Sequence, residues 1–136
     1  MMRFSLHALL TVSLSAVALA GPVSAHHSIQ AQFDINKTIS ISGSVARIEF
    51  INPHSYLTLN VKGADGKVTK WAFEMAALAQ LRSAGLSRAD RGGLKMGDEL
   101  TVVALPARDG SNTGLAQLLK MADGRVFKLA ADAPDL

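Results

Sequence analysis

The chain has 136 residues, of which 49% are hydrophobic, and it carries 14 basic and 11 acidic side chains with a net charge of +3. Because the two signs are interspersed, there is no clustered basic stripe of the kind that binds nucleic acid, and we expect no nucleic-acid partner. Cysteine is absent, which excludes disulfides, thiolate metal sites and thiol catalysis. We therefore expect one small domain that depends on its hydrophobic core.

The first 25 residues are typical of a secretory signal peptide. A basic start precedes the mostly apolar stretch 6–20, and a Gly-Pro pair then breaks the helix. Val23 and Ala25 have the compact side chains that signal peptidase requires before the cut, so we expect cleavage after Ala25, with cleavage after Ala20 as the alternative. The apolar run is shorter than the roughly 20 residues of a transmembrane helix. An exported protein, periplasmic or secreted, without a stable membrane span is therefore expected.

Residues 26–37 have no hydrophobic period and are predicted to form an extended N-terminal arm. A long strand is predicted over residues 38–50, and its apolar alternation changes phase after Gly43, which indicates a bulge or sharp bend. An Asn-Pro turn ends this strand, and residues 54–62 alternate again as a second strand.

The segment GADGK, residues 63–67, is a hairpin signal between the second strand and a third over residues 68–75, with Gly66 left-handed. Pairing Gly63 with Lys67 sets the register of the two strands. The third strand is expected to point Thr69 inward together with its large apolar side chains. The expected cross-strand pairs are Leu59 with Trp71, Leu57 with Phe73, and Tyr56 with Glu74.

The remaining pattern predicts a helix over residues 76–84 that stops at Gly85, and a short turn after it. Strands are predicted at residues 99–107, 115–121 and 126–129, before a flexible tail, 131–136. This order predicts a mainly β fold, an OB-like barrel of five to six strands over residues 38–130, with one helix between the third and fourth strands. An open six-stranded barrel or a sandwich is the alternative.

The histidines carry the main functional hypothesis. Cleavage after Ala25 makes His26 the first residue, and its α-amino nitrogen and ring Nδ1 can chelate one metal ion. His54, in the Asn-Pro-His turn, is the expected third nitrogen ligand, and such a set suits copper or another transition metal. His27 can replace either histidine, and Glu74 offers an oxygen nearby. These residues therefore predict a metal-binding protein, with copper as the expected ion, and we expect no other cofactor.

A second hypothesis is a metal-free domain that binds a partner protein or a small ligand. In this case the histidines are structural or solvated, and the contact residues are expected to be Asn52, Tyr56, Arg108 and Asn112. Trp71 and Met75 suggest Cu(I) ligands, but their alternate spacing is more typical of a core. No catalytic constellation is convincing, so we do not expect an enzyme; a hydrolase or isomerase that depends on Glu74 is a third reading.

Several short motifs together resemble a family of small exported bacterial proteins of unknown function. They are AHHS at 25–28, INPH at 51–54, DGKV at 65–68, WAFEM at 71–75, L-x-x-GDELTV at 94–102, RDGSN at 108–112 and MADGR at 121–125. The resemblance covers nearly all of the mature chain; it implies a mature His-His-Ser start and a periplasmic β-barrel, but no activity. It places His26, His27, Asn52, Pro53, His54, Trp71 and Glu74 at shared positions. Residues 77–93 depart from the family pattern. By fold alone, the chain is also similar to periplasmic OB-fold copper chaperones.

Overall fold

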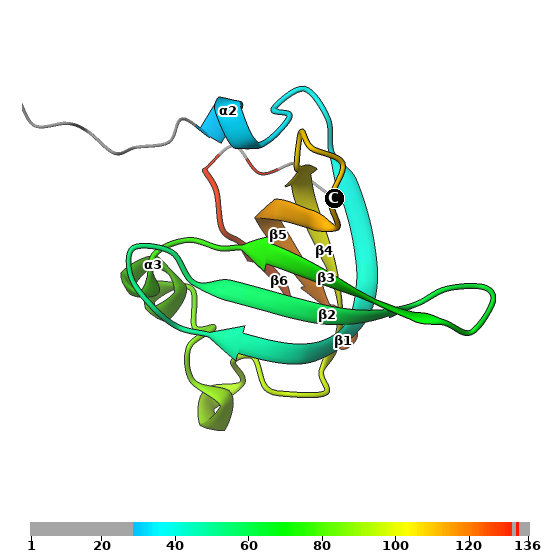
Figure 1. Ribbon diagram of the computed structural model, residues 1–136. Coiled ribbons are helices and arrows are strands. Elements are labelled where there is room, and N and C mark those ends of the chain that lie inside the picture. Colours follow the sequence, from blue (N-terminus) through cyan, green and yellow to red (C-terminus); the bar gives the residue numbers. More distant parts are fainter. Residues whose placement is uncertain (1–28, 132, 134–136) are drawn as a thin grey trace, which may run out of the picture.

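The computed structural model describes residues 29–131 and 133. Its strands form one sheet in the order β3-β2-β1-β4-β5-β6, and a further parallel pairing of β3 with β5 closes β1 to β5 into a barrel (Figure 1). This confirms the predicted OB-like barrel with one additional strand. The elements are α2 (Ile29–Gln32), β1 (Ile39–Glu49), β2 (Tyr56–Lys62), β3 (Val68–Glu74), α3 (Leu78–Ser83), the 3-10 turn η2 (Ala89–Arg91), β4 (Glu99–Pro106), β5 (Thr113–Met121) and β6 (Val126–Lys128).

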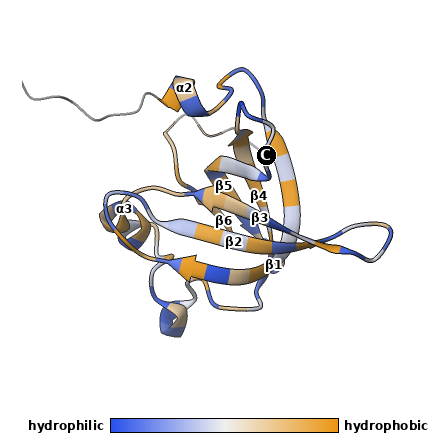
Figure 2. Ribbon diagram, in the orientation of Figure 1, coloured by the Kyte–Doolittle hydropathy of each residue, from blue (hydrophilic) through white to orange (hydrophobic). Residues whose placement is uncertain are grey.

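The bend of β1 lets one strand pair with two neighbours. Its first half pairs with β4 and its second half with β2, and the register shifts between Val45 and Arg47. A methyl group on Gly43 would lie 2.5 Å from the carbonyl oxygen of Asn60, so only glycine permits this close approach. The predicted bulge or bend is confirmed, and the bands of hydropathy along β1 are visible in Figure 2.

The β2–β3 hairpin has the predicted register. The N–H of Gly63 donates to the Lys67 carbonyl at 2.8 Å, and Gly66 has a φ of +80°. All three predicted cross-strand pairs are present. Thr69, however, is exposed, because the pairing of β1 with β2 ends at Asn60 and the hairpin continues beyond the barrel (Figure 1).

The barrel interior is filled by apolar side chains from the strands and from the segment between β3 and β4. Leu57, Leu59 and Phe73 are each 0% exposed, and Leu81 of α3 and Leu86 after it are equally buried. All five belong to one core cluster. The region that departs from the family pattern therefore contributes to the core.

The helix begins later than predicted. Residues 76–84 were expected to be helical, but the pairing of the β1–β2 turn with the end of β3 continues through Met75 and Ala76, which are both bonded to the backbone of Ser55. These contacts keep the chain extended until Ala77, and α3 starts at Leu78. It ends as predicted before the left-handed Gly85.

The two ends of the described chain are more ordered than the sequence indicates. The arm is not extended throughout, because Phe33 donates its N–H to the Ile29 carbonyl at 2.8 Å and closes one helical turn. Ala133, in the expected flexible tail, is 8% exposed and packs with Val103 and Leu118. The expected signal peptide and both N-terminal histidines, His26 and His27, lie outside the described residues. Within these residues no helix has the length and apolar character needed to span a membrane.

Candidate functional site

His54 and Glu74 contact each other where the β1–β2 turn meets the end of β3. The ring Nδ1 of His54 lies against Oε1 of Glu74, and the two side chains are 51% and 18% exposed. Within the described part of the chain, the other ring nitrogen, Nε2, has no hydrogen-bond partner. The pair therefore leaves one imidazole nitrogen available to a ligand, with the ring orientation set by a carboxylate.

The turn that carries His54 is held by backbone and side-chain hydrogen bonds. Ser55 is 0% exposed, and its hydroxyl donates to the Ile51 carbonyl at 3.1 Å. Its own carbonyl accepts the Met75 N–H at 2.8 Å. Asn52 accepts the N–H of Leu78 at 3.3 Å through Oδ1 and so links the turn to α3. Asn52, expected to contact a ligand, uses its amide oxygen within the protein.

Three polar side chains form a row across β1, β2 and β3 beside His54. Tyr56 pairs with Glu49 on one side and with Glu74 on the other, so all three share one face of the sheet. Tyr56 is 38% exposed. Glu49 is bound by Arg47 at 2.9 Å and is partly neutralised. Sequence reasoning missed Glu49, because its place opposite Tyr56 depends on the bulge in β1.

Arg108, through its side chain and main chain, and Asn112, through its main chain, are bound by other parts of the protein. The Arg108 Nε donates to the carbonyl of Gln30 at 2.7 Å, and its backbone N–H donates to that of Gln32 at 2.9 Å. The Asn112 carbonyl accepts the N–H of Ala72 at 3.0 Å, where β3 meets β5. No contact among the described residues joins either of them to His54.

The described residues contain no group of three or more histidine, aspartate or glutamate side chains that could hold a metal ion. Of the four predicted ligands, they include His54 and Glu74, which are in contact, whereas His26 and His27 lie outside them. The described part therefore offers half of the expected set. Any complete site of this design requires the N-terminal histidines.

The aromatic side chains of β3 and the Met75 side chain, directly after this strand, belong to the core or pack against it. Phe73 and Met75 are 0% and 1% exposed, and the Trp71 ring stacks on Phe73 with centroids 6.0 Å apart. A thioether buried in this way fills space in the barrel.

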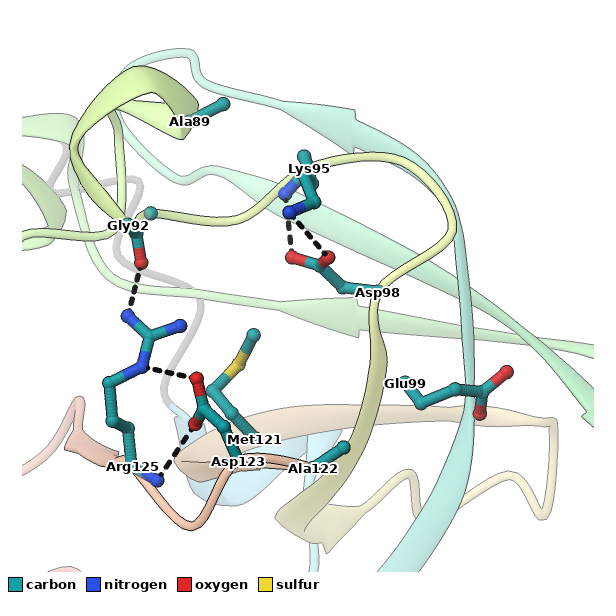
Figure 3. Close-up of a pocket in the computed structure, with 10 residues that line it drawn as sticks. Ala89, Gly92, Lys95, Asp98, Glu99, Met121, Ala122, Asp123 and Arg125 are labelled. Carbon is teal, nitrogen blue, oxygen red and sulfur yellow. Dashed lines mark hydrogen bonds and ion pairs between the residues drawn. The ribbon is translucent and has the colours of Figure 1, made fainter.

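A second polar region lies between the β5–β6 turn and the loops before β4. A hollow of about 190 Å³ is lined there by the charge-paired cluster, defined as Lys95, Asp98, Asp123 and Arg125 (Figure 3). Arg125 donates to Oδ2 of Asp123 at 2.7 Å and to the Gly92 carbonyl. Lys95 pairs with Asp98 at 3.7 Å. Every charged group of this cluster has a partner inside the protein, so it is a structural network.

Comparisons with known proteins place the chain in a family. No curated protein matches it. Residues 14–117 match the family of unknown function DUF6152, and this range includes His26, His27, His54 and Glu74. The match covers more than half of the chain and confirms the resemblance to a family without an established activity. The chain therefore belongs to DUF6152, a family of unknown function.

Proposed function

We propose that this protein is an exported metal-binding domain, with copper as the preferred ion and His54 as its central ligand. The observation that carries the proposal is the contact between Nδ1 of His54 and Glu74. Metal-binding histidines commonly hold one ring nitrogen on a carboxylate, which orients the imidazole and raises the basicity of the other nitrogen. Nε2 of His54 is then the metal ligand, and Glu74 orients it.

The charge around His54 favours a cation. Glu74 is largely covered and contacts the imidazole, and Glu49 lies two strands away on the same face of the sheet, on the other side of Tyr56. Arg47 compensates Glu49, whereas no basic side chain of the described residues pairs with Glu74 apart from His54 itself. A positive ion at Nε2 would be attracted by the remaining negative charge.

The other ligands in this proposal come from the mature N-terminus. Export and cleavage after Ala25 would give His26 a free α-amino group, which forms a chelate with its own ring Nδ1. Together with Nε2 of His54 this provides three nitrogen ligands, a set that suits Cu(II). His27 is the alternative imidazole.

The second candidate is a metal-free interaction domain that binds a partner protein or a small ligand at the same turn. The observation in its favour is the exposure of two large side chains there, Ile51 at 49% and Tyr56 at 38%. Exposed apolar and aromatic groups beside polar ones are common in binding surfaces. This candidate predicts binding that Ile51→Ser weakens and that copper does not affect.

The test begins with the mature terminus. Mass spectrometry of the protein secreted from its full-length precursor should find His26 as the first residue; Gly21, from the cut after Ala20, would remove the amine ligand from the proposal. Calorimetric titration of this mature protein with Cu(II) then compares the wild type with His54→Ala. We expect a loss of at least about 10-fold in affinity. Tyr56→Phe is the matched control, because it changes a neighbouring polar group and keeps the ring.

Equal copper affinities of the wild type and His54→Ala would contradict the proposed site. Glu74→Gln provides a second effect, because it leaves the ligand in place and removes the carboxylate that orients it. Substitution of such orienting groups commonly lowers metal affinity by about 10–100-fold.

A further inference from the structure

We propose that the β2–β3 hairpin binds an extended acidic segment of another protein by strand addition along its outer edge. The site is the first half of β3, residues 68–71, on the side that faces away from β2, and we call it the hairpin edge. It lies at the opposite end of β3 from Glu74, so this inference does not depend on the proposed metal site.

The hairpin edge is the part of β3 that has a neighbour on one side only. β3 pairs with β2 along its whole length, whereas its pairing with β5 includes only Ala72, Phe73 and Glu74. Within the described part of the chain, no strand lies on the outer side of residues 68–71. The hairpin also extends beyond the rest of the sheet (Figure 1). Such an edge presents unpaired backbone donors and acceptors to another chain.

The hydrogen bonds of the hairpin show which backbone groups face outward. In an antiparallel pair, every second residue directs its N–H and C=O to the partner strand, and the residues between direct theirs away. The Lys67 carbonyl accepts the N–H of Gly63 at 2.8 Å, so the odd-numbered residues of β3 face β2. In agreement, the N–H of Ala72 faces away from β2 and donates to the Asn112 carbonyl at 3.0 Å. The backbone groups of residues 68 and 70 therefore face the open side of the hairpin edge.

The side chains beside the hairpin edge make it basic. Residues 60–70 contain three lysines and one aspartate, which gives a net charge of +2. Lys67 pairs with this aspartate, Asp65, at 3.7 Å, whereas Lys62 and Lys70 have no partner among the described residues. Both are exposed and share the outward face of the hairpin with Val68, which is 60% exposed. The face therefore suits a strand that carries carboxylates.

The charge decides between an acidic segment and a second copy of this chain. Pairing of two hairpin edges would bring the lysines of both copies onto one small surface, and like charges on paired strands are destabilising. Lysines on edge strands commonly prevent self-association in this way. An acidic strand would gain backbone hydrogen bonds at residues 68 and 70 and would neutralise Lys62 and Lys70. At one end it must stop beside Trp71, because β5 occupies the edge from Ala72 onward.

The experiment uses a short synthetic peptide in which valine and glutamate alternate. One control peptide has lysine in place of glutamate, and a second keeps the glutamates but has a methylated backbone that cannot donate hydrogen bonds. Amide hydrogen exchange of the protein is followed by NMR. We expect the acidic peptide to slow exchange at Val68 and Lys70, because their N–H groups become bonded. Exchange at Thr69 and Trp71, which are already bonded to β2, should change little.

Three variants separate charge from backbone pairing. Lys70→Glu should weaken the acidic peptide roughly 5-fold, whereas Lys120→Glu, the same reversal at an exposed lysine of β5, should bind it as the wild type does. Val68→Pro removes one N–H of the open side and keeps the lysines, and proline is tolerated at the first residue of a strand. It should weaken binding as well. Slow exchange at the core residue Leu57 checks that each variant is folded.

Four outcomes would overturn the inference. Equal binding of the methylated peptide, or slower exchange without preference for residues 68 and 70, would show electrostatic attraction without strand addition. Equal binding of the lysine peptide would overturn the acidic character of the partner. A dimer in sedimentation that Val68→Pro dissociates would make a second copy the occupant. A wild type that binds no acidic peptide would overturn the inference and leave the proposed metal site unaffected.

Discussion

The β1–β2 turn and the charge-paired cluster are both polar and exposed, but they differ in what they leave unsatisfied. In the cluster, Arg125 and Lys95 each bind a neighbouring carboxylate, and Arg125 also binds a backbone carbonyl. At the turn, the contact of His54 with Glu74 uses one ring nitrogen and leaves the other without a partner among the described residues. The difference shows that a polar hollow is not by itself a candidate site. Among the described residues, an imidazole nitrogen without a partner distinguishes the turn.

The largest effect on stability is expected for Gly93→Ala, in the loop beside the charge-paired cluster. A methyl group at this position would lie 2.6 Å from the Leu86 carbonyl oxygen and 2.7 Å from that of Arg88. Because both neighbours are backbone atoms, the loop must move, and we expect a loss of about 2–3 kcal/mol in the free energy of unfolding. Urea denaturation of the wild type and Gly93→Ala measures this loss. Gly110→Ala, in an exposed loop where nothing crowds the added methyl but φ is +75°, gives the cost of backbone conformation alone.

The next effect is expected for Arg125→Ala. This side chain joins Asp123 to the Gly92 carbonyl and lies 5.6 Å from the centre of the Phe127 ring. Partial exposure weakens each contact, so we expect a loss of about 1 kcal/mol. Arg125→Lys should retain only part of this stability, because an ammonium group cannot reproduce the hydrogen-bond directions of the guanidinium. Full stability of Arg125→Ala in urea would remove the structural role of the cluster.

The comparison also separates what the sequence could predict from what it could not. The register of β2 and β3 was predictable, because a five-residue hairpin and two alternating strands specify the same pairs, including Tyr56 with Glu74. The bend in β1 was predictable from Gly43 and the change of phase. Both features depend on residues that are neighbours in sequence or follow a simple period.

The missed features depend on contacts between distant segments. Glu49 joins the site only because the bulge in β1 aligns it with Tyr56. The docking of Phe33 on Ala107 follows no period, since Phe33 is an isolated aromatic residue in a polar segment. Arg108 was expected to contact a ligand from its polar loop, and the sequence offered no signal that its partner is Gln30. These contacts form only because closure of the barrel brings segments that are distant in sequence together.

At the turn, His54→Ala should have little effect on folding. Its side chain is 51% exposed, and it contributes one contact to an exposed pair. We expect a change below about 0.5 kcal/mol in the free energy of unfolding of the metal-free protein, measured in urea with a chelator present. A larger loss than that of Arg125→Ala would reverse the comparison, because the turn would then be the structural element. Together with a loss of copper affinity, an unchanged stability would separate binding from folding.

The smallest effect is expected on the stability of the fold at low pH, and it arises from Asp123 in the charge-paired cluster. The backbone N–H of Arg125, followed by its guanidinium, holds the pKa of Asp123 below its usual 3.8. A carboxyl whose pKa is lower in the folded state stabilises the fold above its unfolded pKa, and this contribution is lost as the pH falls through the folded value. The unfolding midpoint of the wild type should therefore exceed that of Asp123→Asn at pH 6, and the two should converge as the pH falls below 3.8 and through the lowered pKa. Curves that stay parallel down to pH 2 would show that ionisation of Asp123 contributes nothing to the stability of the fold.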